Sequence, residues 1–219
     1  VYSGNFAAEA EVTQADCTRM TMGIHDAQFN FELQPQESFT APEVMLSFSS
    51  EGLGKLSQNY HKAIRYHICR GKYKTARRPI LINNWEATYF NFNTEKLLDI
   101  AREAKKLGVE MLVMDDGWFG KREDDVSGLG DWFVNEKKLG GKLKELVDGV
   151  NEIGLKFGIW FEPEMISEDS DLYRAHPDWA LQIPGRAPTR GRQQLVLDFS
   201  REDVRTCIFD QMCAILESS

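Results

Sequence analysis

The chain has 219 residues, of which 42% are hydrophobic, and its 26 Lys and Arg against 34 Asp and Glu give a formal net charge of −8. This length allows one large or two small domains with a substantial core. The acidic balance and the lack of a basic stripe argue against nucleic acid or an anionic membrane surface as partner. No run approaches the roughly 18 apolar residues of a membrane span.

The cysteines bear on the redox compartment of the protein, and the first residues bear on whether the sequence belongs to a longer chain. No C-x-x-C pair or His at ligand spacing accompanies Cys17, Cys69, Cys207 and Cys213. We therefore expect free thiols in a reducing compartment, and predict no metal site and no cofactor. Because Val1-Tyr2-Ser3 contains neither an initiator Met nor a charged leader, we interpret the chain as the interior of a longer protein.

Residues 1–50 have a β pattern. Apolar residues alternate over 6–12 and over 29–33, and Val44–Phe48 is a third candidate strand. We interpret this region as the tail of a β-sandwich. Residues 51–78 are predicted to be a helical linker, because apolar residues recur at helical spacing up to Cys69 before a basic, solvated connector.

From residue 79 the pattern changes to alternating strands and helices. Strands are predicted at Pro79–Asn84, Val109–Met114 and Phe157–Trp160, and the helices between them end at Gly108 and Gly154. Helices that lead directly into buried strands indicate βα units and a parallel sheet, hence an α/β fold.

A third helix is predicted to open at Ser200 and to run through Ile215. The spacing from Ser200 to Asp203 fits a capping box. A fourth strand is due where the chain stops at Ser219. Since three strands do not close a barrel, we expect part of the fold to lie outside this sequence.

Each predicted strand ends in Trp and carboxylates. The three clusters are Trp85-Glu86, Asp115-Asp116-Gly117-Trp118 and Trp160-Phe161-Glu162-Pro163-Glu164. Because the C-terminal ends of parallel strands converge on the face that binds ligand, we expect these side chains to surround one molecule. Acids together with indoles suit a neutral, hydroxyl-rich ligand with one apolar face, such as a sugar ring.

Two alternatives apply to the adjacent acids Asp115 and Asp116. They could form a divalent metal site with Glu162 or Glu164, or they could cap a helix. For both side chains to reach one ligand, the strand has to end or twist, and Gly117 supplies that freedom.

The indoles and one long loop also have two interpretations. Trp85, Trp118 and Trp160 could be core residues or could stack on a sugar. The Gly/Pro-rich loop 183–192 contains three arginines that could bind hydroxyls or carboxylates, or could be surface charges.

Four motifs, in order, resemble bacterial α-galactosidases of glycoside hydrolase family 36, the melibiase-like enzymes. They are NNWEATYF (83–90), DDGWFG (115–120), WFEPEM (160–165) and DLYRAHP (171–177). The resemblance implies the C-terminal part of a β-supersandwich domain at 1–50 and a linker at 51–78. It also implies that 79–219 is the first part, about three βα units, of a (β/α)8 TIM barrel truncated before strand four.

The resemblance also implies retaining hydrolysis of terminal α-galactosyl residues in oligosaccharides such as melibiose and raffinose. By motif, Asp115 and Asp116 bind the galactose 4- and 6-hydroxyls. Trp85 and Trp160 wall the pocket, and Arg192 contacts the sugar or orients the nucleophile.

The family's nucleophile lies in a Lys-Trp-Asp motif at the end of barrel strand four, and its acid/base Asp follows later. Both are expected beyond Ser219, so no catalytic residue is predicted here and the chain alone is expected to be inactive. The resemblance further implies a cytoplasmic homo-oligomer, for example a tetramer. Alternatives are galactosyl transfer, α-N-acetylgalactosaminidase activity, or a non-catalytic sugar-binding segment.

Overall fold

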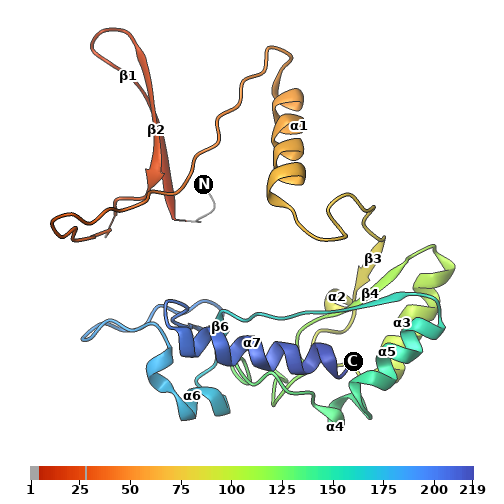
Figure 1. The fold of residues 1–219 in the computed structure, drawn as a ribbon. Coiled ribbons are helices and arrows are strands. Elements are labelled where there is room, and N and C mark those ends of the chain that lie inside the picture. The colour runs from red at the N-terminus through yellow and green to blue at the C-terminus, as the bar shows by residue number, and fades with distance from the viewer. Residues whose placement is uncertain (1–4, 28) are drawn as a thin grey trace. The chain divides into compact units, whose positions relative to one another are not determined.

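The computed structural model describes residues 5–27 and 29–219, so Val1–Ser3 lie outside the described residues. It divides into an N-terminal unit, which extends to Arg77, and a C-terminal unit, Arg78–Ser219 (Figure 1). Each unit is described by itself.

The N-terminal unit begins with a β-hairpin. Strand β1 (Phe6–Val12) pairs antiparallel with β2 (Thr18–Ile24) over its whole length. The alternation over 6–12 is confirmed as a strand. The second strand was not predicted, because its polar and Met residues alternate too weakly to stand out.

Two further predicted strands were wrong. Among the described residues, neither 29–33 nor Val44–Phe48 belongs to a strand. The aromatic side chains of the first segment instead gather locally, with the ring of Phe39 centred 4.7 Å from that of Phe31 and 5.9 Å from that of Phe29. Alternation along a chain becomes a strand only when a neighbouring strand takes its backbone hydrogen bonds.

The predicted helix near residues 51–69 is present as two segments. Helix α1 (Leu53–Ala63) continues into a π-helical turn, η1 (Ile64–Ile68), where the Cys69 amide donates to the Ile64 carbonyl at 2.9 Å. None of the residues in these two segments is buried. Their apolar stripe is therefore formed but not packed into a core.

The C-terminal unit is built on a parallel sheet of three strands. Strands β3 (Leu81–Asn83), β4 (Met111–Met114) and β5 (Lys156–Ile159) lie in the order β3-β4-β5, in register Ile82–Leu112–Phe157. The α/β fold and the parallel sheet predicted from the sequence are confirmed. Helices α3 (Thr94–Lys106) and α5 (Leu143–Glu152) connect the strands and contact each other (Figure 1).

Shorter elements complete this unit. These are α2 (Trp85–Thr88), α4 (Glu136–Leu139), β6 (Met165–Ile166) antiparallel to β7 (Leu195–Val196), α6 (Asp171–Ala175), η2 (Pro177–Trp179) and the long α7 (Glu202–Glu217).

The helix ends follow the sequence in two cases and depart from it in one. Gly108 and Gly154 have φ of +84° and +86° and close α3 and α5 with paired amide-to-carbonyl bonds of the Schellman type. The predicted capping box at Ser200 is wrong: its hydroxyl donates to Asp198 at 2.6 Å, while Asp203 binds Arg201 at 2.7 Å. Helix α7 therefore starts only at Glu202.

Among residues 5–27 and 29–219, the buried apolar side chains all lie in the C-terminal unit. Leu112 and Met114 of β4 are fully buried beneath the helices, and Leu97, Leu146 and Ile208 pack into the same cluster. Alternate β4 residues thus form the centre of the core, which fixes the position of the residues that follow the strand.

Candidate functional site

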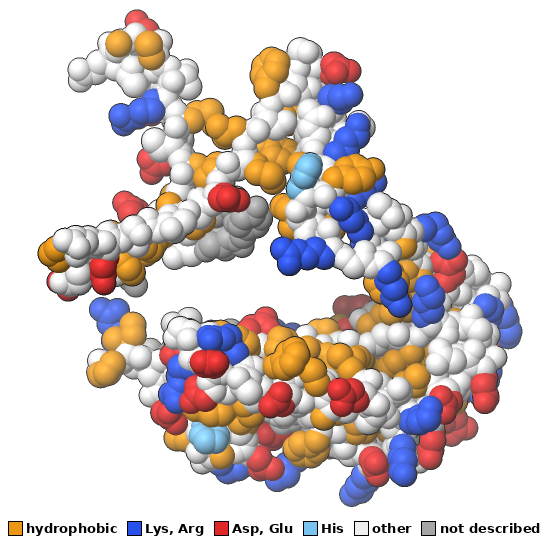
Figure 2. All heavy atoms as spheres, viewed as in Figure 1, with side chains coloured by type: hydrophobic (Ala, Val, Ile, Leu, Met, Phe, Trp, Pro, Cys, Tyr) orange, Lys and Arg blue, Asp and Glu red, His pale blue; other side chains and the backbone are white. Residues whose placement is uncertain are grey.

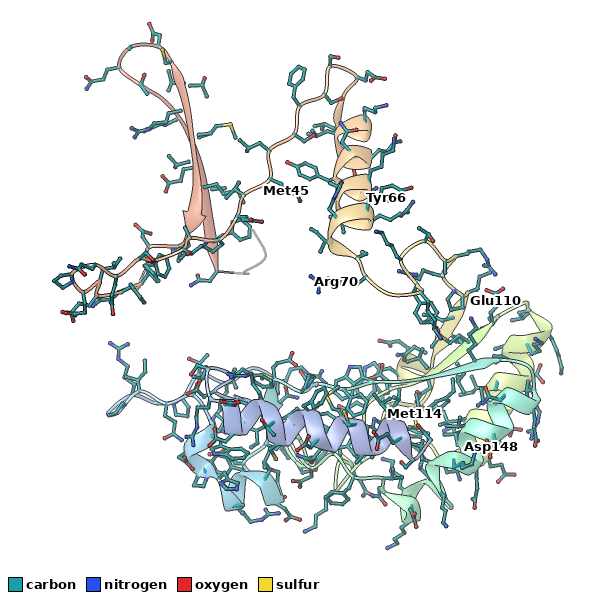
Figure 3. All side chains as sticks on the ribbon, viewed as in Figure 1. Met45, Tyr66, Arg70, Glu110, Met114 and Asp148 are labelled. Atoms are coloured by element: carbon teal, nitrogen blue, oxygen red, sulfur yellow. The ribbon has the colours of Figure 1, made fainter. Side chains whose placement is uncertain are left out.

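The C-terminal ends of the three parallel strands lie side by side. Asn83 is in register with Val113, and Met114 with Ile159, so the residues after each strand leave the sheet at one edge. Figure 3 labels Met114 at the end of β4. This is the convergence that the sequence predicted.

Two asparagines connect the ends of β3 and β4. Asn83 donates its side-chain amide to Asp115 Oδ2, and its Oδ1 accepts from the Trp85 amide at 2.7 Å. The fully buried Asn84 accepts from the Asp115 amide at 2.8 Å. Trp85 and Asp115 are thereby held next to each other by the backbone and by Asn83.

Asp116 forms a buried ion pair with Arg122. Arg122 Nε donates to Oδ1 and Oδ2 at 3.0 and 3.2 Å, and Nη2 donates to Oδ2 at 2.8 Å. Asp116 is only 2% exposed and Arg122 is fully buried. The remaining guanidinium nitrogen, Nη1, donates to the Ser127 carbonyl at 2.9 Å. The carboxylate is thus fixed in one orientation by three charge-assisted contacts from a single guanidinium.

Gly117 allows the chain to turn away from the strand directly after the acids. Its φ is +100°, and a Cβ there would lie 2.8 Å from Phe90 Cδ1 and 3.3 Å from both the Arg122 carbonyl and Lys138 Nζ. Phe90 therefore lies too close for an alanine at this position unless its ring shifts, and the two other contacts would be tight.

Lys138 places a second cation near Asp116. Its Nζ lies 5.0 Å from the centre of the Phe92 ring and 5.8 Å from that of Phe90. Burial lowers the pKa of this ammonium, while Glu123 and Asp116 act in the opposite direction. Within the described part of the chain, Nζ has no hydrogen-bond acceptor, so the two aromatic faces are its main contacts.

The predicted tryptophans differ in burial: one is a core residue and two are half-buried at the strand ends. Trp118 is fully buried and donates its indole N–H to the Trp160 carbonyl at 3.0 Å, so it is a core residue. Trp160 is half-buried, with its amide bonded to the Met114 carbonyl at 2.9 Å and its ring roughly parallel to that of Phe119. These contacts fix Trp160 at the end of β5.

Trp85, the other predicted wall, is also half-buried. Its ring meets Phe90 and Tyr89 edge-on, with centroids 5.1 and 5.2 Å apart. Phe90 in turn lies under the Arg122 guanidinium, 5.7 Å from ring centre to Cζ. Trp85 is thus connected through Phe90 to the Asp116–Arg122 pair.

Arg192 reaches the same group of residues from the long loop. Its Nη2 donates to Asp125 Oδ1 at 2.6 Å, and that oxygen lies 3.9 Å from Arg122 Nη2. Arg192 is exposed and has a φ of +48°. The structure therefore brings all five predicted site residues into the C-terminal unit and joins Arg192 to the buried pair through Asp125.

Glu162 is a further acid of this site. Burial raises the pKa of its carboxyl, and the neighbouring Glu164 adds to the shift. Asp116 also raises it, whereas Arg122 and Arg192 lower it. Its Oε2 is buried without a partner among the described residues. As for the metal alternative, residues 5–27 and 29–219 contain no group of three His, Cys, Asp or Glu side chains placed to hold an ion.

The sequence reasoning missed Arg122 and Lys138. Both stand in charged stretches that resemble solvated loops, so their composition gave no sign of burial. The available signal was the density of glycines at 117, 120 and 128. At Gly128 a Cβ would lie 2.9 Å from the Arg122 amide, so this loop packs tightly around the arginine.

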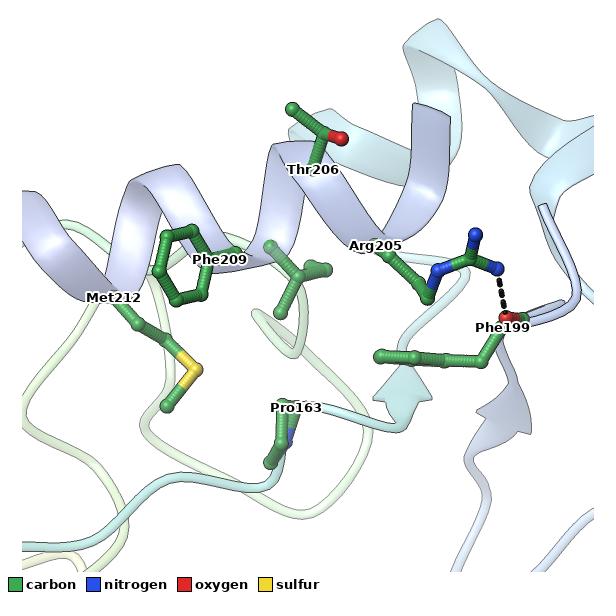
Figure 4. A pocket seen from close by; sticks show the side chains of 7 residues that line it. Pro163, Phe199, Arg205, Thr206, Phe209 and Met212 are labelled. Atoms are coloured by element: carbon green, nitrogen blue, oxygen red, sulfur yellow. Dashed lines mark hydrogen bonds between the residues drawn. The ribbon is translucent and has the colours of Figure 1, made fainter. Parts of the chain in front are cut away.

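A separate hollow lies along α7. It has a volume of about 440 Å³ and is lined by Pro163, Phe199, Arg205, Thr206, Ile208, Phe209 and Met212 (Figure 4). Arg205 Nη1 donates to the Phe199 carbonyl at its rim, at 2.7 Å. The other lining side chains are mostly apolar, and none of the five predicted site residues belongs to it.

A parallel α/β sheet whose strand ends gather acids, arginines and indoles is the arrangement in which enzymes of this fold class bind polar ligands. The sequence profile of the melibiase family matches residues 38–219, and that of the glycosyl hydrolase family 36 N-terminal domain matches residues 1–34. The chain belongs to the melibiase family.

Individual relatives agree with this assignment. The chain is 60% identical to the bifunctional α-galactosidase/sucrose kinase AgaSK of Mediterraneibacter gnavus, with 99% of this chain and 23% of the relative aligned. It is 53% identical to the α-galactosidase AgaA of Geobacillus stearothermophilus, whose crystal structure superposes with a TM-score of 0.95. The match covers 100% of this chain but only 30% of AgaA.

In the described part of the chain, no helix is long and apolar enough to cross a membrane.

Proposed function

We propose that the protein containing this chain is a retaining α-galactosidase, which hydrolyses terminal non-reducing α-galactosyl residues of oligosaccharides such as melibiose and raffinose. The observation that carries the proposal is the joined set of acids and indoles at the ends of β3, β4 and β5. Variants of the similar AgaA enzyme have been solved in complex with stachyose and with raffinose. Those ligands are galactosides of the proposed class.

The proposed ligand contacts are those expected from the motifs. Asp115 and Asp116 accept hydrogen bonds from the galactose 4- and 6-hydroxyls, and charge-assisted bonds of this kind are about twice as strong as neutral ones. Trp85 and Trp160 offer half-buried aromatic faces to the C–H side of the ring. Arg192, exposed and paired to Asp125, binds a hydroxyl or orients the nucleophile.

Catalysis is assigned outside these residues. A retaining glycosidase needs a nucleophile and an acid/base about 5 Å apart. We assign neither role to Asp116, because Arg122 bonds to both of its oxygens and fixes the buried carboxylate in place. We therefore propose that both catalytic carboxylates lie beyond Ser219 and that the chain alone is inactive.

We also propose the domain arrangement that the resemblance to the family implies. Residues 1–50 would be the C-terminal part of a β-supersandwich, 51–78 a linker, and 79–219 the first βα units of a (β/α)8 barrel. The division of the structure at Arg77 and the parallel order β3-β4-β5 support this. The resemblance to the family also leads us to propose a cytoplasmic homo-oligomer, such as a tetramer.

Two alternatives stay open: galactosyl transfer or α-N-acetylgalactosaminidase activity on the same scaffold, and a segment that only binds sugar. Product analysis separates the first, because a transferase needs an acceptor sugar and the other hydrolase needs an acetamido substituent. Calorimetry of the chain with galactose tests the second, since heat of binding without turnover by the full polypeptide would support it.

The main experiment uses the full natural polypeptide that contains this chain, expressed from its gene. We expect it to release galactose from raffinose and from p-nitrophenyl α-galactoside, and Asp115→Asn to lower kcat/KM about 100-fold or more. Asp148→Asn, at an exposed side chain of α5 (Figure 3), is the matched control and should have no effect. Absence of turnover on both substrates contradicts the proposal. Turnover by the chain alone, abolished by Asp115→Asn, contradicts the assignment of catalysis to residues beyond Ser219.

A further inference from the structure

The Asp116–Arg122 ion pair is buried, although burying an ion pair does not by itself stabilise a fold. The side chains of the pair are 3% and 0% exposed. Removing two charges from water costs several kcal/mol per ion, and replacing such a pair by apolar residues is often neutral or stabilising. The pair therefore calls for an explanation other than the stability of the fold.

The geometry fixes the carboxylate rather than merely neutralising it. Arg122 Nε is shared by both oxygens and Nη2 reaches only Oδ2, so Oδ2 accepts two bonds and Oδ1 accepts one. A carboxylate has about four acceptor sites, which leaves one on Oδ1. The arginine itself is held from two further directions, by the Ser127 carbonyl at 2.9 Å and by the Phe90 face.

The two other cations of the site do not perform this task. Lys138 acts on Asp116 through charge alone, since its Nζ has no hydrogen-bond acceptor among the described residues and lies over aromatic rings. Arg192 bonds to Asp125. A point charge attracts the carboxylate without fixing its rotation. The planar guanidinium of an arginine both attracts the carboxylate and fixes its rotation.

We propose that Arg122 is a positioning residue for galactoside binding: it holds the Asp116 carboxylate in the rotation that leaves one Oδ1 acceptor site for a sugar hydroxyl. This rests on the proposed function. Through Asp125, 3.9 Å away, the same guanidinium also couples Asp116 to Arg192 of the long loop. Arg122 does not touch the sugar, and its effect on binding passes through Asp116.

The test is a double-mutant cycle in the full natural polypeptide. Arg122→Lys keeps the positive charge but loses the fork. We expect it to raise KM for p-nitrophenyl α-galactoside about tenfold while kcat changes much less, because an oriented charged hydrogen bond is lost in ground and transition states alike. In an Asp116→Asn background the same substitution should change KM by less than about twofold. Arg174→Lys, in the exposed ion pairs of α6, is the matched control with unchanged KM.

A purely structural role predicts other results. If Arg122→Lys leaves KM at the wild-type value, or raises it equally with and without Asp116, the proposal is overturned. If Arg122→Lys does not fold, the double variant Arg122→Met/Asp116→Leu replaces the pair with apolar side chains. We expect that variant to melt near the wild type and to lose galactoside binding. Binding at wild-type strength contradicts the proposal. Wild-type polypeptide without α-galactosidase activity instead contradicts the proposed function, which separates the two failures.

Discussion

The two units of the chain place similar apolar side chains in opposite environments. In the N-terminal unit, Leu46 and Leu53 are 84% and 82% exposed, whereas Leu112 and Leu146 of the C-terminal unit are fully buried. Figure 2 shows hydrophobic side chains along the surface of the hairpin and of α1. Apolar periodicity thus predicts a helix or a strand, but burial of its apolar side chains requires a second layer of secondary structure packed against it.

The source of that layer is the parallel sheet. Strands β3 to β5 are joined by helices that have to pass over the sheet, so each βα unit brings its own cover. A two-stranded hairpin brings no such cover and is marginal by itself. The C-terminal unit is therefore expected to carry the cooperative stability of this chain.

This comparison can be measured with an intrinsic probe. All five tryptophans, Trp85, Trp118, Trp132, Trp160 and Trp179, lie in the C-terminal unit. Tryptophan fluorescence of the chain thus reports on that unit alone, while circular dichroism also includes α1.

The largest effect is expected from truncating a leucine in each unit. Leu112→Ala removes the fully buried centre of β4 and should lower the free energy of unfolding by about 2–5 kcal/mol. Leu46→Ala, at an exposed position, should change it by less than about 0.5 kcal/mol. Urea titration measures both, followed by tryptophan fluorescence for Leu112→Ala and by circular dichroism for Leu46→Ala. Equal losses in the two variants would show that Leu46 is buried in solution and would break the comparison.

A second comparison concerns two glycines that both have a positive φ. Gly117 and Gly52 have φ of +100° and +87°, so alanine at either site costs about 1–3 kcal/mol of backbone strain. At Gly117 the new Cβ would also lie 2.8 Å from Phe90 Cδ1, which adds about 1–3 kcal/mol, whereas at Gly52 no heavy atom lies within 4 Å.

Gly117→Ala should accordingly shift the urea midpoint of tryptophan fluorescence. Gly52→Ala should leave that midpoint unchanged and lower only the helical signal of α1 in circular dichroism. A fluorescence midpoint unaffected by Gly117→Ala would contradict the close packing of Phe90 against the turn after β4.

Much of the C-terminal unit could be predicted from the sequence because its signals are local. Gly108 and Gly154 mark helix ends by their positive φ, and the apolar runs before Trp85, Asp115 and Trp160 are the three strands of the sheet. The strands expected at 29–33 and 44–48 failed because strand formation depends on a distant partner. The capping box at Ser200 failed because the Ser200 amide donates to Asp198, while the Asp203 carboxylate binds Arg201 instead.

The residues proposed to face the ligand could be predicted from the sequence, but the residues that hold them in place could not. Trp85, Asp115 and Trp160 follow directly from strand ends, since topology alone brings those ends together. Arg122 comes from a loop whose path depends on tight glycine turns, and the half-buried Lys138 comes from the short helix α4. A charged residue that becomes buried in such a stretch has the same sequence signature as one that stays in water. Buried charge partners are thus the part of a site that a single sequence hides.

The smallest expected effect is on the pH dependence of the stability of the C-terminal unit. Asp131, 6% exposed, accepts the Asp171 and Leu172 amides at the start of α6 at 2.9 and 3.0 Å, yet burial raises the pKa of its carboxyl above the ordinary 3.8. Between 3.8 and the raised pKa the folded chain binds more protons than the unfolded chain, so this residue makes stability rise as pH falls through that window. Asp131→Asn removes that contribution, and the stability of wild type minus variant should therefore increase from pH 7 towards pH 4. A difference that stays flat with pH would mean that water reaches this carboxyl and that the buried unit is more open than its packing indicates.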